Sequence, residues 1–289
     1  MIETAPAKIN LYLHIGPTRA DGLHALTSLF AFARAGDRIR VEPAADLSLE
    51  VVGPFASALE GLAPQDNIVF KAARALRALG APNLGAKITL EKNLPVAAGV
   101  GGGSADAAAA LRALNALWEI DASRNTLRTI AFRLGADVPA CLDAAPIYVS
   151  GAGEVIEKGP RAPRLWVVLA NPGIAMPTGR VFSAFDARNP RPEAPSTPRL
   201  EDPSVAGVAK LMASSRNDLE PIAVSRAPII GSVVSLLAAQ PGAVAARMSG
   251  SGATAFGLYS SQEAAERAAR RARAQDWWAS ASALERGDV

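Results

Sequence analysis

A glycine-rich segment that passes directly into an alanine-rich stretch constrains the fold of this chain more than any other feature. The segment reads Pro95-Val-Ala-Ala-Gly-Val-Gly-Gly-Gly-Ser-Ala105, and four of the five positions from 99 to 103 are glycine. Because glycine has no Cβ, such a loop brings bare backbone close to a ligand. The helix that follows begins with free N–H groups and a partial positive charge. The pattern therefore predicts an anion site, for which a nucleotide phosphate is the natural occupant.

Two familiar phosphate loops and one purely structural interpretation compete with this hypothesis. A Walker A loop is excluded, since no Gly-Lys-Ser or Gly-Lys-Thr follows the glycines. A dinucleotide fingerprint is excluded because Lys92, Asn93 and Pro95 separate the glycines from the preceding strand pattern. The structural alternative is a turn that only caps the helix, but a cap needs one glycine.

Composition excludes several classes of protein. The chain has 289 residues, enough for one large domain or two ordinary ones, and 49% of them are hydrophobic, which does not fit disorder. No apolar run approaches the roughly 18–20 residues of a membrane helix. The first residues show no cationic region followed by an apolar stretch, and the single cysteine, Cys141, cannot form an internal disulfide. We therefore expect a cytoplasmic protein with no membrane partner.

The charge pattern gives no sign of nucleic-acid binding. The net charge is +3, from 30 basic and 27 acidic residues, and aromatic residues make up 5% of the chain. The most basic stretch, residues 267–273, is spaced with acidic residues as on a solvated helix face. Too few aromatic residues are present for base-stacking platforms.

The periodicity of apolar residues predicts a mixed order of strands and helices. Strands are predicted at 7–15, 38–42, 47–52, 87–90, 147–149, 155–157, 164–170, 243–248, 255–259 and 277–284. Helices are predicted at 68–79, 104–118, 123–135, 178–186, 204–213, 227–239 and 262–274. The five prolines of residues 188–203 predict a surface loop. The order favours an α+β fold, and we place a domain boundary near residue 155, giving domains 1–155 and 156–289.

Three further segments carry residues that could do chemistry. They are Ala5-Pro-Ala-Lys-Ile-Asn10, Gly135-Ala-Asp-Val-Pro139 and Ser249-Gly-Ser-Gly252. Lys8 and Asn10 are two apart and so share one face of a strand, although a solvated strand start has the same pattern. Asp137 could be a reactive carboxylate or could only cap the next turn. The third segment could be a plain hairpin turn.

Three segments of the chain, one of them the glycine-rich segment, resemble the three signature motifs of the GHMP small-molecule kinases and occur in the same order. The matching stretches are Ala5–Asn10, Pro95–Ala110 and Met248–Ala253. A finer similarity, to the members of this family that act on a cytidine diphosphate ester of methylerythritol, lies in Ala7–Leu11, Arg19-Ala-Asp-Gly-Leu-His24, Gly101–Ser104 and Leu134-Gly-Ala-Asp-Val-Pro139. The resemblance extends from about residue 4 to residue 285.

The resemblance implies a two-domain GHMP kinase fold of the α+β class, with an N-terminal domain like domain 2 of ribosomal protein S5 and a ferredoxin-like C-terminal domain. It implies ATP-dependent phosphorylation of the 2-hydroxyl of that ester, giving ADP, in the non-mevalonate route to isopentenyl diphosphate. We expect a monomer or a weak homodimer. One alternative is a GHMP kinase for homoserine, mevalonate or a sugar, although those relatives lack the Arg19–His24 pattern. The other alternative is a non-catalytic nucleotide-binding protein. The absence of Lys8 or Asp137 would indicate such a protein, and both residues are present.

The resemblance also implies roles for individual residues. Asp137 matches the aspartate that takes the proton from the acceptor hydroxyl, and Lys8 matches the lysine beside that hydroxyl. The positions that match the lining of the cytidine diphosphate site are Asn10, His24, Phe30, Thr178 and Phe182. The positions that match the loop around the ATP phosphates are Pro95, Val96, Ala97, Ala98, Gly99, Val100, Gly101, Gly102, Gly103, Ser104 and Ala105. Asn67 and Lys92 match positions that contact the adenosine end of ATP. Gly250, Ser251 and Gly252 match the loop of the third motif, and Ser104 matches the partner of Mg²⁺.

Two positions depart from the family pattern. Leu23 stands where an aromatic residue often stacks on cytosine, so a stacking contribution of about 1 kcal/mol is lost. Ala105 stands where a second serine often follows the first, which leaves Ser104 as the expected metal partner. His14 and Cys141 have no base or ligand motif nearby, and we interpret both as structural.

Overall fold

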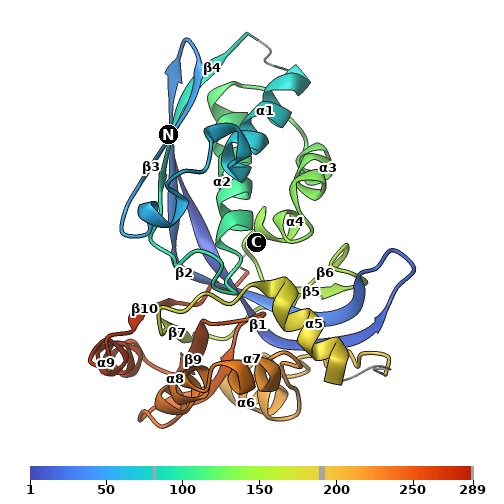
Figure 1. Ribbon diagram of the computed structural model, residues 1–289, viewed down its shortest axis with the longest axis vertical. Coiled ribbons are helices and arrows are strands. Elements are labelled where there is room, and N and C mark those ends of the chain that lie inside the picture. Colours follow the sequence, from blue (N-terminus) through green and yellow to red (C-terminus); the bar gives the residue numbers. More distant parts are fainter. Residues whose placement is uncertain (81–82, 189–192, 288–289) are drawn as a thin grey trace. The chain divides into compact units, whose positions relative to one another are not determined.

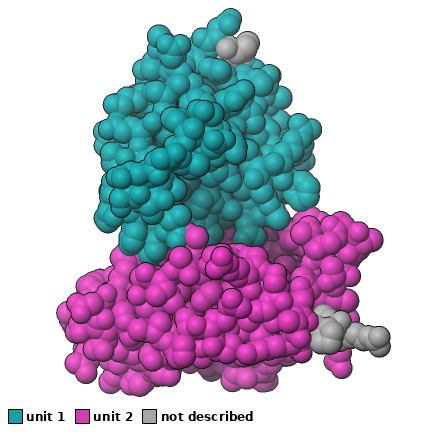
Figure 2. Space-filling view, in the orientation of Figure 1, with its two compact units in different colours: residues 1–7, 36–96, 101–143 teal, residues 8–35, 97–100, 144–289 magenta. Residues whose placement is uncertain are grey.

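The computed structural model describes residues 1–80, 83–188 and 193–287, which form two compact units (Figure 2). Unit 1 consists of Met1–Ala7, Gly36–Val96 and Gly101–Asp143; unit 2 consists of Lys8–Ala35, Ala97–Val100 and Ala144–Val289. The glycine-rich segment passes from unit 1 into unit 2 and back within a few residues. The boundary near residue 155 concerns family domains rather than these units and stays a prediction.

The elements follow one another in mixed order (Figure 1). The strands are β1 (Ile2–Thr18), β2 (His24–Ala44), β3 (Leu47–Val52), β4 (Gly85–Glu91), β5 (Ile147–Ser150), β6 (Val155–Lys158), β7 (Trp166–Asn171), β8 (Ala243–Met248), β9 (Ala255–Tyr259) and β10 (Trp278–Ala283). The helices are α1 (Ile68–Gly80), α2 (Gly102–Leu117), α3 (Arg124–Leu134), α4 (Val138–Cys141), α5 (Thr178–Arg188), α6 (Val205–Ala213), α7 (Glu220–Arg226), α8 (Ile229–Ala238) and α9 (Gln262–Arg273). Two short 3-10 helices, η1 (Ala56–Leu59) and η2 (Pro64–Asp66), precede α1.

Unit 1 is a small sheet covered on one face by helices. Strand β3 runs parallel to β4, and β4 runs antiparallel to residues 38–44 of β2. Ile39, Val41, Ile88 and Leu90 are buried, whereas their neighbours along each strand are partly or fully exposed, as the period of two in a strand requires. Figure 1 shows α1 to α4 on one side of these strands. All alanines of α2 except the exposed Ala116 are buried, so this helix packs closely in the unit.

Unit 2 contains the second sheet and the ends of two strands that it shares with unit 1. Residues 28–30 of β2 pair with β5, which forms an antiparallel hairpin with β6. The second sheet is antiparallel, in the order β10-β7-β9-β8. Helices α8 and α9 pack on it through one apolar core, to which α9 contributes a face of alanines: Ala264, Ala265, Ala268, Ala269 and Ala272. The arginines of α9 are exposed, which confirms the predicted solvated face.

Most predicted elements are present, and β3, β8 and β9 have the predicted limits. Strands β1 and β2 are longer than predicted, and α4 and α7 were not predicted at all. Residues 193–203 contain no helix or strand, as the predicted loop requires; residues 189–192 of that loop lie outside the described residues. His14 and Cys141 are buried, which confirms their structural interpretation. Across the described ranges, no helix has both the length and the apolar composition to cross a membrane.

Candidate active site

Strand β1 places Lys8 and Asn10 side by side in unit 2. The Lys8 ammonium donates a hydrogen bond of 3.1 Å to Asn10 Oδ1 and lies 4.2 Å from the centre of the Phe30 ring. The Asn10 amide nitrogen donates to Ser28 Oγ at 2.9 Å. Lys8 and Asn10 are 5% and 2% exposed, so the predicted shared face is confirmed and a solvated strand start is wrong.

The third motif is bonded to the glycine-rich loop within unit 2. The Ser249 hydroxyl donates a hydrogen bond of 2.8 Å to the carbonyl oxygen of Gly99, and the N–H of Thr254 donates to the Ala98 carbonyl at 3.1 Å. On the β1 side, the N–H of Lys8 donates to the Val100 carbonyl at 2.9 Å. The turn at 249–252 is therefore more than a hairpin turn: motifs one and three together hold residues 98–100.

Gly99 is a position where only glycine fits. Its φ is +77°, in the left-handed region. A Cβ there would collide with the Ser249 carbonyl oxygen and lie 2.9 Å from the backbone nitrogen of Gly252. Gly101, with φ of +63°, is the N-cap of α2 and offers no side chain to its N–H groups. The glycines thus permit both the close approach to the third motif and the turn into the helix.

The first turn of α2 has the features of the predicted anion site. It contains no acidic side chain and receives no capping hydrogen bond from a side chain. The first N–H groups of a helix have no partner within the helix, and the helix dipole is positive at this end. Gly103 is exposed and Ser104 partly exposed, so a ligand can reach this turn.

The predicted cytidine-site residue His24 is held by unit 2 through both ring nitrogens. Nδ1 donates a hydrogen bond of 2.9 Å to the Gly16 carbonyl oxygen, and Nε2 lies 2.9 Å from Asp186 Oδ1. The ring contacts two phenylalanines of α5, with its centre 5.5 Å from that of Phe182 and 6.0 Å from that of Phe185. The structure thus places His24 and Phe182 together, with their rings tilted by 31° to each other.

Thr178 and Asn217 secure the loop of the third motif. The hydroxyls of Thr178 and Ser251 are hydrogen-bonded at 2.9 Å. The Asn217 side-chain amide donates to the carbonyl oxygens of Met248 and Gly250 at 2.9 and 2.8 Å. Sequence reasoning missed Asn217, and it named Ser249 only as part of the third segment, without its bond to Gly99. A side chain that binds a distant backbone carbonyl leaves no spacing pattern in the sequence.

In unit 1, Asp137 directly precedes the short helix α4. It occupies the N-cap position but makes no capping hydrogen bond, so the simple capping interpretation is wrong. The Arg112 guanidinium of α2 donates to the carbonyl oxygens of Cys141 and Leu142, at 3.1 and 3.2 Å. The turn that carries the half-buried Asp137 is therefore attached to the same helix that follows the glycine-rich loop.

Asn67 and Lys92, predicted at the adenosine end, are both buried in unit 1. Asn67 Oδ1 accepts a hydrogen bond of 2.9 Å from the N–H of Val69 and so caps α1. The Lys92 ammonium is paired with the carboxylates of Asp37 and Asp106. A contact of either side chain with adenosine stays a prediction.

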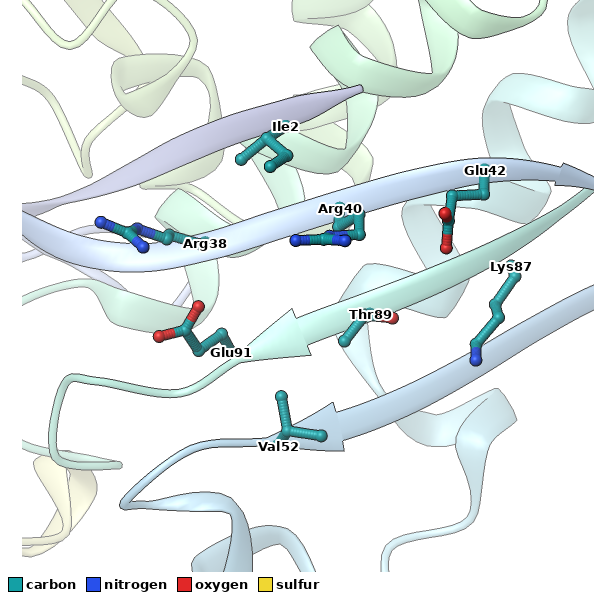
Figure 3. A pocket seen from close by; sticks show the side chains of 8 residues that line it. All are labelled: Ile2, Arg38, Arg40, Glu42, Val52, Lys87, Thr89 and Glu91. Carbon is teal, nitrogen blue, oxygen red and sulfur yellow. The ribbon is translucent and has the colours of Figure 1, made fainter.

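A groove of about 310 Å³ lies on the exposed face of the sheet in unit 1 (Figure 3). Its lining residues are Ile2, Arg38, Arg40, Glu42, Val52, Lys87, Thr89 and Glu91. Opposite charges face each other across β2 and β4, since Arg38 pairs with Glu91 and Glu42 with Lys87. None of the predicted site residues lines this groove, and its three cations and two carboxylates leave one positive charge in excess.

Comparison with known proteins agrees with the motifs. The family model of the N-terminal domain of GHMP kinases matches residues 67–151, and that of the C-terminal domain matches residues 198–276. A 4-diphosphocytidyl-2-C-methyl-D-erythritol kinase of Parvibaculum lavamentivorans is 49% identical over 97% of this chain and 97% of its own length; one of Cereibacter sphaeroides is 48% identical over 95% of each. A crystal structure of 4-(cytidine 5'-diphospho)-2C-methyl-D-erythritol kinase has a TM-score of 0.79 and 33% identity, and covers 99% of each chain. The chain therefore belongs to the GHMP kinase family.

Proposed function

We propose that this chain transfers the γ-phosphoryl group of ATP to the 2-hydroxyl of 4-diphosphocytidyl-2-C-methyl-D-erythritol, giving the 2-phosphate and ADP. The observation that carries this proposal is the full-length similarity, 49% identity over 97% of the chain, to a relative of that name. The reaction is a step of the non-mevalonate route to isopentenyl diphosphate. The chain has both residues, Lys8 and Asp137, that the chemistry needs.

The glycine-rich loop and the start of α2 bind the phosphates of ATP in this proposal. Phosphoryl transfer needs the phosphates held and their charge offset far more than it needs covalent help from the protein. The uncapped N–H groups at residues 102–104 and the positive end of the helix dipole supply that stabilisation. The bonds from Ser249 and Lys8 to residues 99 and 100 support this assignment, because they keep the loop in one shape before ATP arrives.

Asp137 and Lys8 act on the acceptor in this proposal. The Asp137 carboxylate takes the proton of the 2-hydroxyl as it attacks the γ-phosphorus, and the Lys8 ammonium stabilises the negative charge that develops. Lys8 is suited to this role since its Nζ is fixed by Asn10 and the Phe30 ring. A fixed donor stabilises a transition state without first having to be ordered.

Mg²⁺ fits the residues at the start of α2. No group of three or more His, Cys, Asp or Glu side chains is arranged to hold a metal ion in the described part of the chain. Mg²⁺ keeps several waters and commonly takes substrate phosphates as ligands, so it does not need such a group. Ser104, partly exposed in the first turn of α2, would hold the ion together with the ATP phosphates. The bound ion would offset phosphate charge.

The cytidine end of the substrate packs against His24 and Phe182 in this proposal. Both His24 nitrogens are already hydrogen-bonded or ion-paired within unit 2, so its ring offers a face rather than a free edge. Phe182 is partly buried and presents an aromatic surface beside it. Base stacking on such a surface contributes about 1–3 kcal/mol.

The test is a substrate comparison with the purified protein. ADP release would be followed with ATP, Mg²⁺ and one acceptor at a time: 4-diphosphocytidyl-2-C-methyl-D-erythritol, homoserine or mevalonate. We expect turnover with the cytidine compound alone, and a phosphate ester at the 2-oxygen detectable by phosphorus NMR. Faster turnover with homoserine or mevalonate would contradict the proposal. Asp137→Asn serves as the control for contaminating kinases, because any activity that survives it unchanged does not come from this site.

A further inference from the structure

The ammonium of Lys92 lies at the centre of a buried ion cluster in unit 1. Its Nζ donates to Asp106 Oδ2 at 2.7 Å and is paired with Asp37 Oδ2. The side chains of Lys92, Asp37 and Asp106 are 3%, 0% and 3% exposed. The ammonium is thus buried between two carboxyl groups, and a bound nucleotide cannot replace these partners without opening the cluster.

Asp37 connects this cluster to the chain that enters the phosphate loop. Its second oxygen, Oδ1, accepts hydrogen bonds from the backbone N–H groups of Asn93, at 2.6 Å, and Leu94, at 2.8 Å. One carboxylate therefore fixes the backbone of two consecutive residues and the side chain of the residue before them. The loop itself begins at the next residue, Pro95.

Asp106 connects the cluster to the helix on the other side of the loop. It is the fifth residue of α2. Its Oδ2 accepts a hydrogen bond from Lys92 Nζ, whereas its Oδ1 is buried with no hydrogen-bond partner among the described residues. Gly102, the first residue of α2, lies against the same ions: a Cβ there would be 3.4 Å from Lys92 Nζ and 3.5 Å from Asp37 Oδ2. The first turn of α2 therefore packs against the ions of Lys92 and Asp37.

Two ionised carboxylates around one ammonium would leave the cluster with one excess negative charge, which favours a protonated carboxyl on Asp106. Burial raises the pKa of the Asp106 carboxyl above its usual range. Burying such charges is costly, and removing one partner leaves another uncompensated. A buried ion cluster with this cost adds little to the stability of the fold. We therefore expect its contribution to be the geometry that it imposes on residues 93–106.

We propose that Asp37, Lys92 and Asp106 are positioning residues for nucleotide binding, which hold the two ends of the phosphate loop in register, and that the Lys92 ammonium does not contact adenosine. The inference rests on the proposed function in taking ATP as the donor and residues 95–105 as its phosphate loop. The cluster connects β2, the segment after β4 and α2, so any change in it shifts the loop relative to the helix start. Phosphate binding would suffer, whatever base the nucleotide carries.

The test replaces part of the cluster with apolar side chains. In the double variant Lys92→Met/Asp106→Leu, the ammonium and one of its two carboxyl partners are removed together. The Asp37 carboxylate that remains keeps the backbone N–H groups of Asn93 and Leu94 as donors. Folding is checked by circular dichroism and thermal melting. Binding of ATP, GTP and ADP is measured by calorimetry, which needs no acceptor. Kinetics then give KM for ATP, KM for the acceptor and kcat.

We expect the double variant to bind all three nucleotides about 10- to 100-fold more weakly, with an unchanged ratio of ATP to GTP affinity and an unchanged KM for the acceptor. Asp106→Asn keeps an acceptor for Lys92 and is expected to restore binding to within about twofold of the original chain. Lys87→Met is the matched control, since Lys87 lies on β4, just before the segment that carries Lys92, and is paired with Glu50, but is half-exposed. This control is expected to bind nucleotides normally.

Three outcomes would overturn the inference. Unchanged ATP affinity in a folded double variant would mean that the cluster is only part of the core. A change in the ratio of ATP to GTP affinity would place Lys92 at the base instead. Equal losses in Asp106→Asn and the double variant would show that the pairing geometry is irrelevant. Failure of the proposed function is distinguishable, because the unmodified chain would then bind ATP normally yet leave the cytidine acceptor unphosphorylated, or would bind no ATP at all.

Discussion

The hydroxyl of Ser249 donates a hydrogen bond of 2.8 Å to the carbonyl oxygen of Gly99, and so joins two segments that lie 150 residues apart. The Ser249 carbonyl also lies where a Cβ of residue 99 would be. Because the same hydroxyl accepts from the N–H of Asn10, at 3.3 Å, one side chain connects all three motifs. The shape of the loop is therefore set from outside the loop.

Gly99→Ala should destabilise the protein and abolish tight ATP binding. A left-handed φ costs a non-glycine residue about 1–3 kcal/mol, and the collision with the Ser249 carbonyl adds to this. Gly103→Ala is the matched control for stability: its Cβ would meet only Ile68 Cγ2, at 3.8 Å, and alanine favours a helix by about 0.5–1 kcal/mol. Thermal melting and ATP calorimetry of both variants check this. Equal stability of the two would contradict the assigned loop geometry.

Asp137→Asn should lower kcat on the order of 10²-fold or more while the fold is retained. Asparagine keeps the shape of the side chain but cannot accept the proton of the hydroxyl. Because Asp137 makes no capping bond to α4, the helix loses no cap in this variant. Stopped assays with both substrates saturating measure kcat, and thermal melting serves as the control for folding. A kcat close to that of the original chain would contradict the assignment of Asp137 as the catalytic base.

Phe182→Ala should raise KM for the cytidine substrate far more than KM for ATP. The lost stacking and burial correspond to about 1–3 kcal/mol. Leu23, 54% exposed, stands where the family often has an aromatic residue, so Leu23→Tyr should leave binding unchanged or improve it. Steady-state kinetics of the two variants give all four KM values. Equal effects of Phe182→Ala on both substrates would mean that the cytidine lies elsewhere.

His14 should make the protein less stable as the pH falls below about 6.5. Burial lowers the pKa of its imidazole below the usual 6.5, and the neutral ring donates from Nδ1 to the Ser196 carbonyl, at 2.9 Å, and accepts at Nε2 from the Arg216 N–H, at 3.2 Å. The unfolded chain therefore binds the proton first as pH falls, so the stabilisation is complete above about pH 6.5 and is lost below it. Melting temperatures between about pH 8 and pH 5 check this. His14→Gln should show a shallower dependence; an equal slope would assign the effect to other groups.

Local sequence patterns predicted those elements whose signals lie within their own residues. Helix α3 begins after Ser123, which caps it, and ends at Gly135, as the cap residues indicated. Helices α4 and α7 were missed because each is short and has a proline in its first turn, where it breaks no hydrogen bond. The first half of β2 was missed because its apolar residues run on without alternation, which hides the period of a strand.

The sequence by itself determined the family, the three motifs and the pairing of Lys8 with Asn10, because residues two apart on a strand share a face. The tertiary structure alone decided what those motifs touch. The burial of Lys92 between Asp37 and Asp106, and the bond from Ser249 to Gly99, join residues 14, 55 and 150 positions apart. Such contacts depend on how strands and helices pack rather than on any local period, so an isolated lysine or serine in the sequence gives no sign of them.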